Sequence, residues 1–373
     1  MLRVLLITEP SGGGSGRHVV DLAEGLCALG HEVSVIYSST RAEPRFNSEL
    51  HALPLRSIRD LPMKRSVGPW DLGAAYRLAQ MIRKSGPFDI VHAHSSKAGA
   101  LLRLVAPRGS TRIYTPHAFR TMDPTMGAKG RVVFGTIEAI LARYFTDALI
   151  AVAPEEVQHA HSLGVPPDKI HLVVNGVTPA REIDREAARS ELGIAPGELA
   201  VGFVGRLADQ KDPLRFAQAL KIARESNSRL RGIILGSGEL ASAVKSAGGD
   251  AVTIFEGCNA RDFLPAFDLF AMTSKYEAMP YVLLEALQAG LPIVSTQVGG
   301  VSITVRNGEN GFVVPVSASP EELVGAILSA AADEQRKKFA AVSSEMASQF
   351  GADKMAKETN AVYSSAIRAR AKS

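Results

Sequence analysis

Short β-rich apolar runs alternate with helical patterns along this chain, and the alternation occurs twice. In the first half the apolar runs are RVLLIT, EVSVIYS, DIVHAHS, TRIYTP, DALIAVA and KIHLVVN. A second series consists of AVGFVGR, RGIILGSG, AVTIFEG, DLFAMTS, PIVST and GFVVPV, and the residues from about 320 onward are helical in pattern. Strands that alternate with helices predict parallel sheets with crossover helices. The chain is therefore predicted to be an α/β protein.

The length supports two such units. At 373 residues the chain is too long for one ordinary hydrophobic core. Two successive doubly wound domains imply a cleft between them, and ligands of such domains bind outside the carboxyl ends of the strands. The loops that follow predicted strands are therefore the places to look for functional residues.

Composition excludes several classes of protein. Hydrophobic residues make up 46% and charged residues 21%, which is ordinary for a soluble protein. No run of 18 apolar residues occurs, so no membrane-spanning helix is expected. The N-terminal apolar run is short and resembles a first strand more than a signal peptide. Cys27 and Cys258 lie far apart, which favours free thiols and a cytoplasmic protein.

The positive charge is concentrated in the first half of the chain. Residues 1–180 carry 20 Lys and Arg against 15 Asp and Glu, a net charge of +5, and the remainder carries 22 against 23, or −1. All nine histidines lie at or before His171. This pattern allows an anionic partner for the first half, but the excess is too small to indicate a nucleic acid.

The stretch SKYEAMPYVLLEALQAG contains two glutamates, Glu277 and Glu285, in otherwise apolar sequence. We expect Glu277 in a loop, Pro280 in the first turn of the following helix, and Gly290 at its end. Carboxylates accept hydrogen bonds from sugar hydroxyls, and a helix N-terminus favours phosphate. The pair therefore suits the two ends of one elongated ligand; the alternative is a loop carboxylate and a solvated helix carboxylate.

Two cations follow the first strand of the second series. Arg206 comes directly after AVGFVG, and Lys211 is five residues further on. Cations at the carboxyl end of a strand can hold a diphosphate, with arginine able to bind it through two hydrogen bonds. The alternative is that both are solvated surface charges.

The remaining signals are weaker. Four glycines between residues 12 and 16 allow a ligand to approach the backbone, but the loop is neither a Walker loop nor a dinucleotide fingerprint. His117 follows a strand. His92 and His94 lie on one strand face and could bind metal, but no third ligand is apparent. No Asp-x-Asp pair or nucleophile elbow occurs.

Taken in order, GRLADQKDP, LGSGEL, SKYEAMPYVLLEALQAGLPIVSTQVGG and VRNGENGFVVP resemble the retaining glycosyltransferases of family 4, which have the GT-B fold. The glycine-rich loop, GHEVSV, DIVHAHSSKAG, TPHAF and NGV fit the same family, so the resemblance covers nearly the whole chain. It implies two Rossmann-like domains across a cleft: residues 1–178 on the acceptor side, and residues 179–351 binding a nucleotide sugar. The C-terminal helix, 352–373, would pack back on the first domain.

The resemblance also implies roles for individual residues. Glu277 would contact hydroxyls of the donor sugar, and Glu285 would bind the ribose. Arg206 and Lys211 would stabilise the diphosphate leaving group. His117 would lie near the reacting centre. The remaining donor-binding positions would be Gly13, Gly14, Gly236, Met279, Pro280, Tyr281 and Val282.

Two positions depart from the family pattern. Ala278 stands where many members have glycine, and its methyl group should be tolerated if φ stays negative. Ser302 stands where many members carry an acidic residue, so no role is expected there. The resemblance further implies transfer with retention of configuration, no protein nucleophile, and neither a metal nor a cofactor beyond the nucleotide sugar.

The motifs do not fix the nucleotide, the sugar or the acceptor. UDP is the first expectation for the nucleotide and GDP the second; the sugar, a hexose, and the acceptor, a glycan or a polyprenyl-diphosphate-linked hydroxyl, are family-level expectations, as is a role in polysaccharide biosynthesis. The basic segment 57–73, with Arg56 just before it and Arg59, Lys64, Arg65 and Trp70 within it, is predicted to be a surface loop that contacts the inner face of an anionic membrane or a lipid-diphosphate acceptor; an ordinary exposed loop is the alternative. Alternative functions are a nucleotide-sugar epimerase of the same fold and a non-catalytic nucleotide-sugar-binding subunit.

Overall fold

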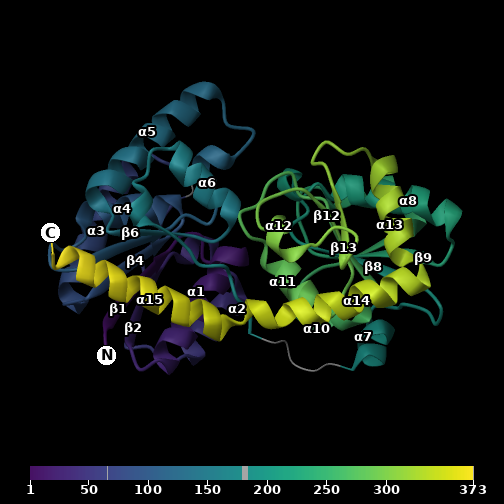
Figure 1. Cartoon of the computed structure of the whole chain (residues 1–373), viewed down its shortest axis with the longest axis horizontal. Helices are drawn as coiled ribbons and strands as arrows, with labels where there is room; N and C mark the ends of the chain where they lie inside the picture. The colour runs from purple at the N-terminus through teal and green to yellow at the C-terminus, as the bar shows by residue number, and fades with distance from the viewer. Residues whose placement is uncertain (65, 179–183, 373) are drawn as a thin grey trace. The chain divides into compact units, whose positions relative to one another are not determined.

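The computed structural model describes residues 1–64, 66–178 and 184–372, and the chain divides into two compact units (Figure 1). Unit 1 comprises Met1–Thr178 and Ala352–Ser373, and unit 2 comprises Pro179–Gly351. Residues 179–183, at the predicted domain boundary, lie outside the described residues. Both units are parallel α/β structures, which confirms the predicted fold class.

Unit 1 is built on a seven-stranded sheet in the order β3-β2-β1-β4-β5-β6-β7, with all pairs parallel. Its strands are β1 (Arg3–Thr8), β2 (Glu32–Tyr37), β3 (Ser57–Asp60), β4 (Ile90–His94), β5 (Thr111–Thr115), β6 (Ala148–Ala151) and β7 (Ile170–Leu172). Its helices are α1 (Gly13–Ala28), α2 (Pro44–Ala52), α3 (Trp70–Ser85), α4 (Ser96–Val105), α5 (Ala128–Phe145), α6 (Pro154–Ser162) and α15 (Ala352–Arg370), with 3₁₀ turns at Ser39–Arg41, Arg120–Met122 and Pro167–Lys169.

The first strand shows why the apolar runs are continuous. Val4 and Leu6 of β1 pack into a core that includes residues of α1 and α15, whereas Leu5 and Ile7 pack into a core on the other face with residues of α3 and α4. A central parallel strand is covered on both faces, so neither side of it can be polar.

The C-terminal helix α15 completes unit 1, as expected. It packs along α1 (Figure 1). Met355, Ala356 and Tyr363 belong to the same core as Val4. Gly25 on α1 allows the close approach, because a Cβ atom at that position would lie 2.4 Å from the Cβ of Ala356.

Unit 2 is built on a six-stranded parallel sheet in the order β10-β9-β8-β11-β12-β13. Its strands are β8 (Leu199–Val204), β9 (Leu230–Leu235), β10 (Val252–Phe255), β11 (Leu269–Met272), β12 (Ile293–Thr296) and β13 (Gly311–Val314). Its helices are α7 (Arg185–Glu191), α8 (Pro213–Ser226), α9 (Ala241–Gly248), α10 (Ala260–Phe263), α11 (Tyr281–Gln288), α12 (Val301–Thr304), α13 (Pro320–Ala331) and α14 (Asp333–Ala347), with 3₁₀ turns at Asp209–Lys211, Gly249–Ala251, Leu264–Ala266 and Ser348–Phe350.

The prediction that residues 57–73 form one surface loop is wrong. Ser57–Asp60 is the edge strand β3, and Trp70 begins helix α3, so only the residues between them form a connection. The strand escapes recognition because it is short and only partly covered, and it therefore has no apolar run. Arg65 lies outside the described residues.

The sequence predicts no membrane-spanning helix. In the structure, across the described ranges, no helix combines the length and the apolar character needed to cross a bilayer.

Candidate functional site

In unit 2 the strand order reverses between β8 and β11, the neighbours from which the sheet is built outward in both directions. At such a switch point the loops after two adjacent strands diverge and leave a crevice for ligands. Arg206 and Lys211 follow β8, and Glu277 follows β11. The structure therefore places three of the predicted residues at the switch point of unit 2.

Lys211 and Glu277 form an ion pair. The Nζ of Lys211 lies 2.6 Å from the Oε1 of Glu277, and the two side chains are only 18% and 12% exposed. The loops that carry them are tied together, because Thr273 Oγ1 donates a hydrogen bond to the Lys211 carbonyl and Gln210 Nε2 donates one to the Tyr276 carbonyl. The pair is consequently held in a fixed place between the two strand ends.

Arg206 differs from Lys211 in its surroundings. Its side chain is exposed, and its guanidinium lies 3.4 Å from the Oε1 of Gln210, a long hydrogen bond. The cation can therefore reorient toward an anionic ligand at little cost.

The loop after β11 leads directly into helix α11. Pro280 has an extended backbone and precedes the first helical residue, Tyr281, so the prediction that it lies in the first turn is wrong by one position. Ala278 does not adopt a positive φ, as required for its methyl group to be tolerated. Gly299 packs on this loop, since a Cβ there would lie 2.5 Å from the Glu277 carbonyl oxygen. The amides of Tyr281 and Val282 lie at the start of the helix, four and five residues after Glu277.

Glu285 lies on α11 among buried apolar residues. Its Oε1 is 3.3 Å from the Nε of Arg261, and the two side chains are almost fully buried. Arg261, on α10, was missed by the sequence analysis because it belongs to no recognised motif. The ion pair holds the Glu285 carboxylate in one orientation.

Close packing against a neighbouring loop requires a glycine at position 236. It follows β9, and a Cβ atom there would lie 1.9 Å from the carbonyl oxygen of Gly205, the residue before Arg206. Gly236 therefore brings the loop after β9 close to the loop that carries Arg206. Ser302 is exposed on α12, where no role was expected.

The predicted residues of unit 1 follow β1 and β5, the two strands that flank β4 in its sheet. His117 follows β5, and its Nε2 lies 3.1 Å from the Nδ1 of His94, the last residue of β4. His18 on α1 completes a cluster, with its ring centroid 4.5 Å from that of His117. Sequence analysis missed His18, which lies far from the other two along the chain.

Burial makes the cluster neutral. Burial lowers the pKa of His18 to about 4, although a hydrogen bond with Asn175 acts in the opposite direction. Burial, reinforced by the neighbouring histidines, holds the pKa values of His94 and His117 well below the usual range. Three neutral imidazoles can donate hydrogen bonds or bind a metal ion, but they do not supply positive charge at neutral pH.

The cluster has the composition of a metal site. One ring nitrogen from each of His18, His94 and His117 lies within 4.8 Å of the others. His92 shares the strand face of His94, as predicted, but it is held by Tyr363 at 2.7 Å and by Thr115 at 2.9 Å. The predicted pairing of His92 with His94 in a metal site is therefore wrong, because the structure groups His94 with His18 and His117 instead. The expectation that no metal is needed remains a prediction.

The segment around His117 is conformationally strained. His117 and Ala118 both have positive φ, at 53° and 77°, a region that non-glycine residues rarely adopt. The buried carboxylate of Glu156 accepts hydrogen bonds from the N–H of Ala118 and the N–H of Val152, each at 2.8 Å. Glu156 thus fixes the segment that positions His117.

Gly13 and Gly14 are not in a loop, contrary to the prediction, because α1 begins at Gly13. Gly13 has a φ of 58° and donates its N–H to Glu43 Oε1 at 2.9 Å. Gly14 is exposed. The two glycines, like His117, belong to unit 1, and the other predicted site residues belong to unit 2.

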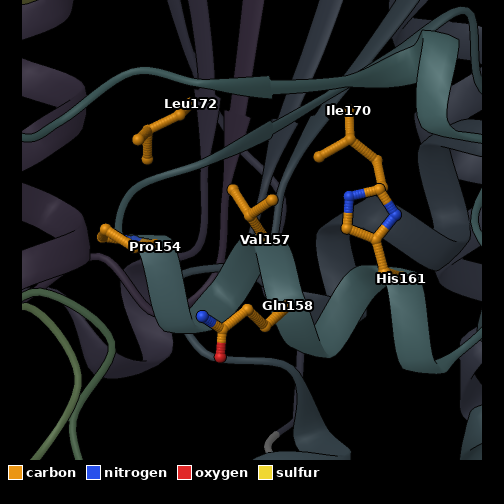
Figure 2. Close-up of a pocket in the computed structure, with 6 residues that line it drawn as sticks. All are labelled: Pro154, Val157, Gln158, His161, Ile170 and Leu172. Atoms are coloured by element: carbon orange, nitrogen blue, oxygen red, sulfur yellow. The ribbon is translucent and has the colours of Figure 1, made fainter.

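A separate pocket of about 370 Å³ lies between α6 and the edge strand β7 (Figure 2). Figure 2 shows Val157 between Ile170 and Leu172 in its wall. The lining residues are Pro154, Val157, Gln158, His161, Ile170 and Leu172. None is a predicted site residue, and none is a carboxylate, Lys or Arg, so this pocket lacks the charges that a nucleotide diphosphate requires.

Two family models match the chain. The model described as Glycosyltransferase Family 4 covers residues 12–181, and the model described as Glycosyl transferases group 1 covers residues 184–346. A relative from Escherichia coli, UDP-Gal:alpha-D-GlcNAc-diphosphoundecaprenol alpha-1,3-galactosyltransferase, is 30% identical over 263 residues, which are 66% of this chain and 67% of that protein. The chain belongs to the family 4 glycosyltransferases. The resemblance found in the sequence is thereby confirmed.

Two further proteins are similar to this family 4 chain. The D-inositol 3-phosphate glycosyltransferase of Rhodococcus erythropolis (strain PR4 / NBRC 100887) is 32% identical over 251 residues, or 61% of this chain, and the match spans only 57% of that protein. The structure of Anabaena Alr3699/HepE in complex with UDP and glucose has a TM-score of 0.82 at 19% identity and covers 98% of this chain and 100% of that chain. The chain therefore has the GT-B fold.

Proposed function

We propose that this chain is a retaining glycosyltransferase that moves a hexose from a nucleoside diphosphate sugar to a hydroxyl of a glycan or lipid-linked acceptor. The observation that carries the proposal is the arrangement at the switch point of unit 2, where Lys211, Glu277 and Arg206 follow adjacent strands. The E. coli relative is a UDP-Gal transferase and Alr3699/HepE binds UDP, which supports UDP as the first choice, with GDP second.

In the proposed reaction the protein positions the substrates and stabilises the leaving group. Glu277 accepts hydrogen bonds from the donor sugar, and Glu285, held by Arg261, accepts them from the ribose. Arg206 and Lys211 neutralise the charge that develops on the departing diphosphate, which lowers the barrier most where water is excluded. A phosphate oxygen of the departing group takes the proton of the acceptor hydroxyl on the same face, so configuration is retained.

The acceptor is assigned to unit 1, near His117 and the start of α1. Neutral imidazoles there can orient a hydroxyl by hydrogen bonding. We further propose that the reaction needs no metal, since Lys211 and Arg206 supply the positive charge, and that the protein acts in the cytoplasm. Full transfer activity after dialysis against a strong chelator would support the absence of a metal.

The proposal is tested by measuring nucleotide binding. Isothermal titration with UDP, GDP and ADP should show one preferred nucleotide, and Glu285→Ala should weaken it at least tenfold, because the ribose loses a charged hydrogen-bond acceptor. Glu225→Ala, which removes an exposed carboxylate on α8, is the matched control and should bind normally. No binding of any nucleotide would contradict the donor site.

Product analysis separates the alternatives. Incubation with the preferred nucleotide sugar and an acceptor alcohol should release the nucleoside diphosphate and form a glycoside. Conversion of the nucleotide sugar to an epimer without any acceptor would instead identify an epimerase. Binding without turnover under any condition would identify a non-catalytic subunit.

A further inference from the structure

An exposed apolar stripe runs along helix α5. Val133, Ile137, Ile140 and Tyr144 recur at intervals of four, three and four residues and so share one helix face. The exposed fractions are large for apolar side chains: Val132 68%, Val133 54%, Ile137 45%, Ile140 48% and Tyr144 66%. Isolated exposed apolar residues are normal on a protein surface, but five on one helix form a patch that calls for a partner.

The patch continues onto the neighbouring helices. Helix α4 packs against α5, and α3 packs against α4, on the same side of the sheet of unit 1 (Figure 1). Leu104 on α4 is exposed, as are Leu72 and Tyr76 on α3. The apolar surface therefore extends beyond a single helix.

The exposed charges on these three helices have one sign. Over α3, α4 and α5, all of whose residues the structure describes, the exposed charged side chains are Arg77, Arg83, Lys84, Lys129, Arg131 and Arg143. The two acidic residues on them are shielded and paired: Glu138 with Arg103 at 2.5 Å, and Asp71 with Lys97 at 2.8 Å. The exposed side of these helices thus offers apolar and basic groups and no exposed carboxylate.

From this combination we infer that α5, with the adjoining parts of α3 and α4, is a docking surface for an anionic lipid bilayer. An interfacial helix inserts apolar side chains at the acyl boundary while its basic side chains bind anionic head groups. Charge complementarity selects this partner over a second copy of the chain, because two copies facing each other here would bring like charges together. The surface differs from residues 57–73, which the sequence alone suggested.

Vesicle co-sedimentation tests the inference directly. The protein should bind vesicles of phosphatidylcholine containing phosphatidylglycerol and should not bind vesicles of phosphatidylcholine alone. Ile137→Gln with Ile140→Gln should reduce binding at least tenfold, and Lys129→Gln with Arg143→Gln should reduce it about fivefold for each cation removed at low salt. Circular dichroism should be unchanged, because all four side chains are exposed.

Matched variants distinguish α5 from other sources of binding. Lys337→Gln with Lys338→Gln removes two exposed lysines from α14 in unit 2 and should leave binding unchanged. Lys64→Gln tests the segment between β3 and α3. The inference is overturned if the wild type ignores anionic vesicles, if Lys64→Gln alone abolishes binding, or if the α5 variants change only the oligomeric state in sedimentation velocity.

A spectroscopic readout locates the contact. The chain has one tryptophan, Trp70, so Trp70→Phe gives a background free of tryptophan fluorescence. Ile140→Trp in that background should shift its emission to shorter wavelength on addition of anionic vesicles. Leu172→Trp, at an exposed position of β7, is the control and should not shift. Equal shifts at both positions would contradict insertion through α5.

Discussion

At the scale of single residues, the central feature is the ion pair between Lys211 and Glu277, two residues that are also proposed to bind the donor. A diphosphate that binds Lys211 competes with the Glu277 carboxylate 2.6 Å away, and a sugar hydroxyl that binds Glu277 competes with the ammonium group. Because the two side chains are mostly buried, loss of either one leaves an uncompensated charge in a poorly solvated place. The ion pair therefore holds each side chain in position.

Removal of either cation should impair transfer. Arg206→Ala and Lys211→Ala are each expected to lower kcat about 10²-fold, the scale of a lost transition-state donor. Steady-state transfer kinetics measure the effect, and Lys221→Ala, on the exposed side of α8, is the control that should retain full activity. Near-normal turnover in both variants would remove these residues from the mechanism.

The buried histidines make stability depend on pH with a definite sign. His18 has a pKa of about 4 in the fold against 6.5 for a free histidine, so between these values only the unfolded chain binds the proton. The free energy of unfolding should therefore fall as pH falls from 6.5 to 4, by about 3 kcal/mol from this residue. The lowered pKa values of His94 and His117 act in the same direction.

Glu156 acts in the opposite direction, which provides the test. Burial raises its pKa from 4.5 to about 7, so its contribution is present below pH 4.5 and is lost as pH rises to 7. Urea unfolding at pH 7, 6 and 5 should show a steeper loss of stability on acidification in Glu156→Gln than in the wild type. Glu155→Gln should keep the wild-type slope, and equal slopes in all three proteins would contradict the assignment.

Sequence alone could place residues near a site but could not pair them. Arg206, Lys211 and Glu277 could be predicted from the sequence because each follows an apolar strand run, at the sheet edge where ligands bind. The partnership of His18 with His117, or of Arg261 with Glu285, depends on how distant segments meet, and neither Arg261 nor Glu156 stands in a motif. Local pattern carries no information about such contacts.

At the scale of elements, the packing of α15 on α1 depends on Gly25. Gly25→Ala should destabilise the protein by about 1–3 kcal/mol despite the better helix propensity of alanine, because the added methyl group would lie 2.4 Å from the Cβ of Ala356. Gly73→Ala, in helix α3 with no atom within 4 Å of the added methyl, should instead stabilise it by about 0.5–1 kcal/mol. Chemical denaturation measures both.

The two substitutions share their chemistry and differ only in their surroundings. If Gly25→Ala were as stabilising as Gly73→Ala, α15 would not be seated on α1 as described. Strands were predictable from the sequence when both of their faces are covered, as in β1. The strand β3, which is only partly covered, was missed. An edge strand needs no apolar run, so its pattern resembles that of a loop.

At the scale of the whole molecule, the two units have separate hydrophobic cores. Scanning calorimetry should resolve two unfolding transitions. The preferred nucleotide should raise the midpoint temperature of only the transition that belongs to unit 2. At a concentration one hundred times its Kd the nucleotide should stabilise that unit by about 2.7 kcal/mol. Gly25→Ala should lower only the other transition; a single transition moved by both changes would contradict this separation.

The return of α15 to unit 1 has a consequence for the order in which the chain matures on the ribosome. Unit 2 is encoded without interruption, so it can reach its final structure as soon as residue 351 has left the exit tunnel. Translation of unit 1 begins first, but unit 1 lacks Met355, Ala356 and Tyr363 until the whole of unit 2 has been translated. Until then the core around Val4 and Leu6 is covered by α1 but not by α15, so the unit that begins first is completed after unit 2.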